Sequence, residues 1–216
     1  MAPPDSPPER FPDRAAAGRA LAERLLEIEL DAPVVIALPR GGVPVAHEVA
    51  QALGAPLDIA LVRKLGAPGR PELGIGALGE DGTVILDRGT VAALSVGRAE
   101  IEAIVERESA ELERRRQLYR GDRPAVDVSG RATILVDDGI ATGVTTIAAA
   151  AMLRERGATR VLTAVPVCPA TAVGYLREQL GDLICLSSPL RFGGVGAWYD
   201  DFTQTSDDEV VELLRR

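Results

Sequence analysis

Short apolar runs alternate with amphipathic helical segments along most of this chain. The runs are rich in Val, Ile, Leu and Ala, which is typical of strands that are buried on both faces of a sheet. The predicted strands cover residues 34–38, 57–62, 133–136, 160–165 and 183–186. The predicted helices cover residues 13–29, 43–53, 98–119, 145–156 and 171–180. This order predicts an α/β fold built on a doubly wound parallel sheet.

One segment, residues 63–82, interrupts the alternation. Several glycines and two prolines surround a short apolar patch at residues 73–78. We therefore expect a mobile excursion with at most short strands, with which residues 83–86 could pair.

The chain divides by composition into three parts. Residues 1–10 are proline-rich and polar and predict a disordered tail. Residues 11–190 predict the α/β domain, and residues 191–216 form a C-terminal tail or hood segment.

Composition narrows the class of protein. Of 216 residues, 46% are hydrophobic and only 3% aromatic, and the formal net charge is -8. That acidity gives no general attraction to phosphate backbones, so we expect no nucleic acid partner. No apolar run reaches the roughly 18 residues that a membrane helix needs, and the start MAPPDSPPER lacks the regions of a signal peptide. A cytoplasmic protein without a membrane partner is expected.

The segment ILVDDGIATGVT, residues 134–145, carries the strongest chemical signal. A buried strand ends in Asp137 and Asp138, and a glycine-bounded loop leads into a helix that Thr145 could cap. The backbone amides of this loop would form a nest for a phosphate dianion, and Thr142 would add a hydroxyl. The carboxylates could accept hydrogen bonds from ribose hydroxyls or orient a hydrated Mg²⁺. A Walker loop is excluded because Val144 stands where its lysine would be; a plain Asx-turn or helix cap is the non-functional alternative.

An apolar strand, two acids and a loop ending in TG and a hydroxyl residue resemble the binding motif for phosphoribosyl pyrophosphate (PRPP) in type I phosphoribosyltransferases. The order of elements is similar over about residues 30–190. The segments PRGG and RKLGAPGRPELGIGA look like those of a poorly characterised branch of that family. The resemblance implies a small hood, a flexible loop over the site and a set of 5-phosphate-binding residues. This set is Gly139, Ile140, Ala141, Thr142, Gly143, Val144 and Thr145.

The resemblance also implies a pyrophosphate site. Its loop would be Pro39, Arg40, Gly41 and Gly42, where relatives often hold a strained peptide bond. Glycines let the backbone approach an anion, and the planar fork of arginine matches phosphate oxygens. Lys64 takes the place of a pyrophosphate-contacting lysine, whereas its neighbour Arg63 is expected to be a surface cation. The catalytic set is then Arg40, Lys64, Asp137 and Asp138.

The acceptor side is less defined. Ala141 stands where hypoxanthine-guanine enzymes commonly carry an aspartate base, which disfavours that mechanism and leaves Glu72 or Glu80 as candidate bases. Flat aromatic faces could stack on an acceptor, and Asp200 resembles a residue that helps hold a second Mg²⁺. The candidate acceptor-binding residues are Phe192, Trp198 and Tyr199. Trp198 and Tyr199 equally suit anchoring of the tail onto the domain or onto the partner in a homodimer.

The function expected from these features is transfer of ribose 5-phosphate from Mg-PRPP to a nitrogenous acceptor, with a nucleobase favoured, and release of pyrophosphate. Mg²⁺ is the expected cofactor, and PRPP and a small-molecule acceptor are the expected partners. The alternatives are a PRPP-binding regulatory protein without transferase activity and a hydrolase or phosphatase acting on a sugar phosphate. The acidic chain shows no basic binding surface, which favours the enzyme over a regulator acting on nucleic acid.

Overall fold

Five parallel strands form the central sheet, in the order β2-β1-β6-β7-β8. The computed structural model describes residues 10–215, so all but the last residue of the disordered tail predicted over residues 1–10 lies outside this part. The strands are β1 (Val34–Ala37), β2 (Leu57–Ile59), β6 (Ala132–Val136), β7 (Arg160–Val167) and β8 (Asp182–Ser187). The predicted doubly wound parallel sheet is confirmed.

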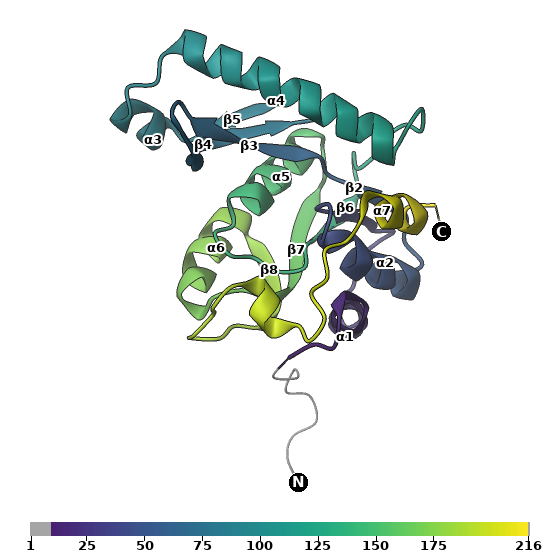
Figure 1. The fold of residues 1–216 in the computed structure, drawn as a ribbon. Helices are drawn as coiled ribbons and strands as arrows, with labels where there is room; N and C mark the ends of the chain where they lie inside the picture. Colours follow the sequence, from purple (N-terminus) through teal and green to yellow (C-terminus); the bar gives the residue numbers. More distant parts are fainter. Residues whose placement is uncertain (1–9, 216) are drawn as a thin grey trace.

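Helices cover both faces of this sheet (Figure 1). They are α1 (Arg14–Leu26) and α2 (Gly42–Leu53) on one face, and α5 (Val144–Glu155) and α6 (Val173–Leu180) on the other. Successive strand residues point to opposite faces, so Val35 packs with the α1 and α2 cluster while Ile36 packs with α5 and α6. All four residues of β1 are buried, which explains the continuous apolar run in the sequence.

A second sheet forms in the segment predicted to be a mobile excursion. It is antiparallel, in the order β3-β4-β5, with β3 (Val62–Ala67), β4 (Arg70–Gly79) and β5 (Val84–Leu86). The strand predicted over residues 57–62 begins where expected but ends at Ile59, because the chain leaves β2 there and enters this second sheet at Val62. The pairing predicted for residues 83–86 is confirmed.

We call residues 62–119 the flap; after the three strands it contains α3 (Arg88–Ala93) and α4 (Arg98–Tyr119). The sheet lies between α4 and α5 (Figure 1). The prediction of at most short strands here is wrong because several of the glycines lie inside strands at closely packed places, while Gly69 and Gly82 lie in the turns with positive φ. A Cβ added to Gly79 would lie 2.7 Å from the sulfur of Met152 on α5, so glycine lets β4 approach that helix closely.

The C-terminal segment returns to the start of the described chain. After the short helix η1 (Ala170–Ala172) and α6, it contains the short helix η2 (Val195–Trp198) and the helix α7 (Asp207–Leu213). Phe11 pairs with Tyr199 in an isolated bridge, and α7 packs against α2 and α4. Both cysteines are free thiols. Within residues 10–215, no helix has the length and apolar character needed to cross a membrane.

Candidate active site

Two loops meet at the carboxyl edge of the central sheet. β1 and β6 are parallel neighbours, so the loop after Ala37 and the loop after Val136 emerge side by side. A Cβ added to Gly41 would lie 2.0 Å from Oδ2 of Asp138, and one added to Gly42 would lie 2.8 Å from the carbonyl oxygen of Val136. Only glycine fits at these two places, and the peptide bond between Pro39 and Arg40 is cis. The structure thus brings the predicted pyrophosphate loop against the two predicted aspartates.

The loop that leads into α5 exposes backbone amides. The helix begins at Val144, and its N-cap is Gly143, with φ of 82° and no side-chain hydrogen bond. The predicted cap at Thr145 is therefore wrong, because glycine reaches the left-handed region that this turn needs. The amide of Ile147 donates to the carbonyl of Gly143 at 2.8 Å. Amides of the first helical turn precede the first intrahelical bond, so they are free to face an anion.

The side chains of this loop differ in burial. Ile140 is buried, and its amide donates to the carbonyl of Val167 at 2.9 Å, which anchors the loop to β7. Ala141, Thr142 and Thr145 are exposed on the outer side. The arrangement can hold a phosphate group through the backbone and two hydroxyls without a lysine.

The two aspartates differ in their partners. Oδ1 of Asp137 accepts from the amide of Asp138 at 2.9 Å, and Oδ2 of Asp138 accepts from Nε of Arg14 at 2.8 Å. Burial and the adjacent charge of Asp138 raise the pKa of Asp137 well above its usual range. Burial also raises the pKa of Asp138, although the hydrogen bond from Arg14 opposes that shift. The two carboxyl groups thus disfavour each other's charged form. A cation bound at this edge would stabilise their charged forms, and an anion would destabilise them.

The predicted cations lie near this edge but face protein partners. Nη1 of Arg40 lies 3.6 Å from Oδ1 of Asp207 on α7, in a half-exposed ion pair. Nζ of Lys64 donates to the carbonyl of Glu72 at 2.9 Å. A Cβ on Gly74 would lie 3.4 Å from the Lys64 side chain and 3.9 Å from Val144, so the lysine passes close to the phosphate-binding loop.

The aromatic residues of the tail divide into separate roles. Tyr199 is 1% exposed, its ring contacts those of Phe11 and Phe202, and its hydroxyl donates to the carbonyl of Asp138 at 2.6 Å. Of the two roles that the sequence allowed for Tyr199, the structure supports anchoring, since no ring face is left for an acceptor. The indole of Trp198 donates to the carbonyl of Phe192 at 2.8 Å, and both side chains are partly buried.

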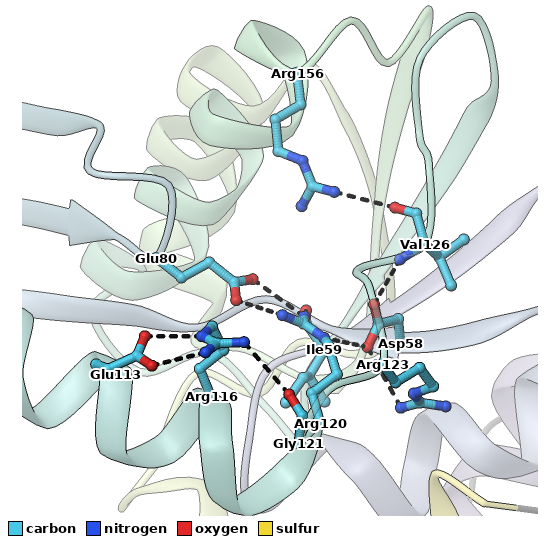
Figure 2. A network of polar contacts seen from close by, with 10 residues as sticks. All are labelled: Asp58, Ile59, Glu80, Glu113, Arg116, Arg120, Gly121, Arg123, Val126 and Arg156. Atoms are coloured by element: carbon cyan, nitrogen blue, oxygen red, sulfur yellow. Dashed lines mark hydrogen bonds and ion pairs between the residues drawn. The ribbon is translucent and has the colours of Figure 1, made fainter.

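Glu72 and Glu80 were the candidate bases, and Asp200 was the candidate ligand of a second Mg²⁺. Glu80 pairs with Arg120 in a buried network (Figure 2), so it is not free to act as a base. The side chain of Glu72 is 99% exposed. Asp200 forms an exposed ion pair with Arg10 at 3.3 Å, and the residues described hold no group of three or more His, Cys, Asp or Glu that could bind a metal ion.

Arg63 binds Glu108 of α4 at 2.8 Å, as expected of a cation outside the site. Arg14 and Asp207, in contrast, are site residues that sequence reasoning missed. Arg14 sits in a helix with Arg19 and Arg24 at similar positions, and no signal in the pattern separates it from them.

The comparisons with known proteins agree with this geometry. The family model described as the phosphoribosyl transferase domain matches residues 11–197. Two curated relatives from Mycobacterium tuberculosis, the products of MT0597 and Rv0571c, are each 47% identical over 206 residues, and their names assign them provisionally to the phosphoribosyl transferases. That match covers 95% of this chain but 46% of each relative, so the chain spans about half their length.

Solved structures give the same result for the fold. The crystal structure of TT1426 from Thermus thermophilus matches with a TM-score of 0.86 and 43% identity, over 95% of this chain and 97% of that one. A hypothetical protein from Neisseria gonorrhoeae, solved with bound ppGpp, shares the fold with a TM-score of 0.51 and 14% identity, over 94% of this chain and 91% of that one. The family match over most of the chain, together with the two loops at one sheet edge, shows that this protein belongs to the phosphoribosyl transferase family.

Proposed function

We propose that the protein transfers ribose 5-phosphate from Mg-PRPP to a nitrogenous acceptor of the nucleobase class and releases pyrophosphate. The observation that carries this proposal is the contact between Gly41 and the Asp138 carboxylate. It places the glycine loop that carries Arg40 directly beside the acidic loop that leads into α5. The two loops are thus about one sugar apart, which suits a donor with phosphate groups at both ends. Membership of the family supports the donor.

The chain's own residues would divide the work in three ways. The free amides at the start of α5 would bind the 5-phosphate, Asp137 would accept from a ribose hydroxyl, and Arg40 and Lys64 would stabilise charge that develops on the departing pyrophosphate. Both cations would exchange a protein partner, Asp207 or Glu72, for phosphate oxygens. No covalent bond to the protein is required.

The donor set also suits Mg²⁺. This ion is usually bound through one or two carboxylates together with substrate phosphates and water, and Asp137 provides a carboxylate beside the loop. Among residues 10–215, no Lys or Arg lies within ion-pair distance of Asp137, whereas Asp138 is paired with Arg14. When bound with PRPP, the ion would neutralise charge on the pyrophosphate group.

The test is incubation of the full chain with Mg²⁺, PRPP and a panel of nucleobases, with release of pyrophosphate as the signal. Release that depends on an acceptor supports the proposal and identifies the acceptor. Binding of PRPP without release from any acceptor would favour the regulatory alternative. A protein that binds no PRPP would contradict the donor assignment, as would a variant with both Asp137→Asn and Asp138→Asn that binds it normally.

A further inference from the structure

Arg14 lies on the first turn of α1 and contacts Asp138, the second aspartate of the candidate site. Its Nε donates to Oδ2 of Asp138 at 2.8 Å, and the two side chains are only 11% and 14% exposed. Water screens such a pair less than a surface pair, so the interaction between the two charges is stronger. The two residues are 124 positions apart in the sequence, and only the fold brings them together.

Two further contacts fix the guanidinium group of Arg14. Its Nη1 donates to the carbonyl of Thr203 at 2.7 Å, and its central carbon lies 4.0 Å from the centroid of the Phe202 ring. A planar, forked cation can bond to two acceptors and stack on a ring at the same time, which a lysine cannot do. The C-terminal tail therefore holds Arg14 in the orientation that meets Asp138.

Asp138 is held from three directions. Arg14 pairs with its carboxylate, the hydroxyl of Tyr199 donates to its carbonyl oxygen at 2.6 Å, and Gly41 leaves the space that its carboxylate fills. One carboxylate oxygen is thus committed to the protein. Asp137, on the same loop, makes no ion pair within the described part of the chain, so the adjacent acids have different settings.

We propose that Arg14 is a positioning residue of the donor site: it orients and neutralises Asp138, which supports the pyrophosphate loop at Gly41 and leaves Asp137 to bind the ribose. Without Arg14, the charge of Asp138 would repel both Asp137 and the phosphates of PRPP. This inference rests on the proposed function, because its readout is the binding of PRPP.

The experiment measures Kd for Mg-PRPP by calorimetry on the full chain and on Arg14→Met, Asp138→Asn and the double variant. Arg14→Met is expected to weaken binding at least about tenfold, which corresponds to about 1.4 kcal/mol. If Arg14 acts through Asp138, the double variant binds no more weakly than Asp138→Asn, because residues that act as a unit are not additive. Arg14→Lys should recover part of the loss.

The control is Arg19→Met, which removes the same charge from the same helix. Arg19 is 58% exposed and its Nη1 lies 3.5 Å from Glu48, so this variant should change Kd less than about twofold. Thermal unfolding of every variant separates loss of binding from loss of folding. If Arg14→Met does not fold, Arg14→Lys and the double variant take its place.

With an acceptor identified, KM for PRPP should rise in Arg14→Met by a larger factor than kcat falls. The reason is that a donor site with a misplaced Asp138 loses affinity for PRPP before it loses the rate of the chemical step. Arg14→Met with the affinity of the wild type would overturn the inference, and so would losses that add in the double variant. A wild-type protein that binds no PRPP would overturn the proposed function and the inference together.

Discussion

Two groups of ion pairs between arginine and carboxylate side chains lie near the C-terminal end of α4. Their nitrogen–oxygen distances are similar, but the side chains differ in burial. At the root of the flap, Nε of Arg120 lies 3.1 Å from Oδ1 of Asp58, and Nη1 contacts Glu80; these three side chains are 2%, 2% and 8% exposed. Within the helix itself, Glu111 lies 2.8 Å from both Arg114 and Arg115. The side chains of those two arginines are 59% and 28% exposed.

The difference shows which charges hold the flap in place. Arg120 also donates to the carbonyl of Ile59 at 2.8 Å, and Asp58 accepts from the amide of Val126 (Figure 2). The network therefore joins the end of β2, the end of β4 and the chain that leaves α4. Breaking a buried pair leaves a charge without water, whereas an exposed pair is replaced by water at little cost.

The largest expected effect is that of Arg120→Met. It leaves Glu80 buried without its cation and leaves Asp58 with only the longer ion pair to Arg123 at 3.8 Å, so the free energy of unfolding should fall by about 3 to 5 kcal/mol. Urea unfolding followed by circular dichroism measures it. The matched control is Arg98→Met, since Arg98 pairs with Glu102 at a side-chain exposure of 92% and should leave the midpoint unchanged. A loss below about 1 kcal/mol in Arg120→Met would remove the contrast between the two groups.

Glu80→Gln should cost less, about 1 to 3 kcal/mol. The amide keeps one acceptor for Arg120 but turns a donor toward it, while the pair between Arg120 and Asp58 survives. The same unfolding experiment compares the two variants directly. If Glu80→Gln proved as harmful as Arg120→Met, Glu80 rather than Arg120 would be the centre of the network.

Glu111→Gln should cost less than about 1 kcal/mol at neutral pH, after allowance for solvent screening. Hydrogen bonds from Arg114 and Arg115 lower the pKa of Glu111 to about 2. A carboxyl with a lowered pKa stabilises the fold above its unfolded pKa and loses this contribution as the pH falls toward the folded value. The difference between wild type and variant should therefore disappear between about pH 4.5 and pH 2. A constant difference over that range would show that the carboxylate charge is not the cause.

The smallest expected effect is that of salt. In 1 M NaCl the Debye length falls to about 3 Å, so the cost of Glu111→Gln should shrink further. The cost of Arg120→Met should stay nearly the same because the network is buried. Unfolding at low and high salt measures both. Equal sensitivity to salt would indicate that water reaches Arg120.

The sequence predicted the central sheet and both site loops because their signals are local. Buried parallel strands require continuous apolar runs, and an anion-binding turn requires glycine beside the strand end. The strands at Val34 and Ala132 and the segment around Asp137 were therefore found within a residue or two of their observed positions. The strands β3 and β4 of the flap were missed because β4 uses glycines for close packing on α5 and on β5, a use that resembles a loop in the sequence.

The amino-acid sequence by itself thus determined the α/β fold, the family and the loops that meet at the candidate site. Tertiary structure alone decided which charges are buried and paired. Arg14 and Arg120 resemble their exposed neighbours in the helical pattern, yet each lies against a carboxylate that is distant in the sequence. The physical reason is that burial and ion pairing depend on contacts between residues far apart in the chain, and a periodic pattern of one helix carries no information about them.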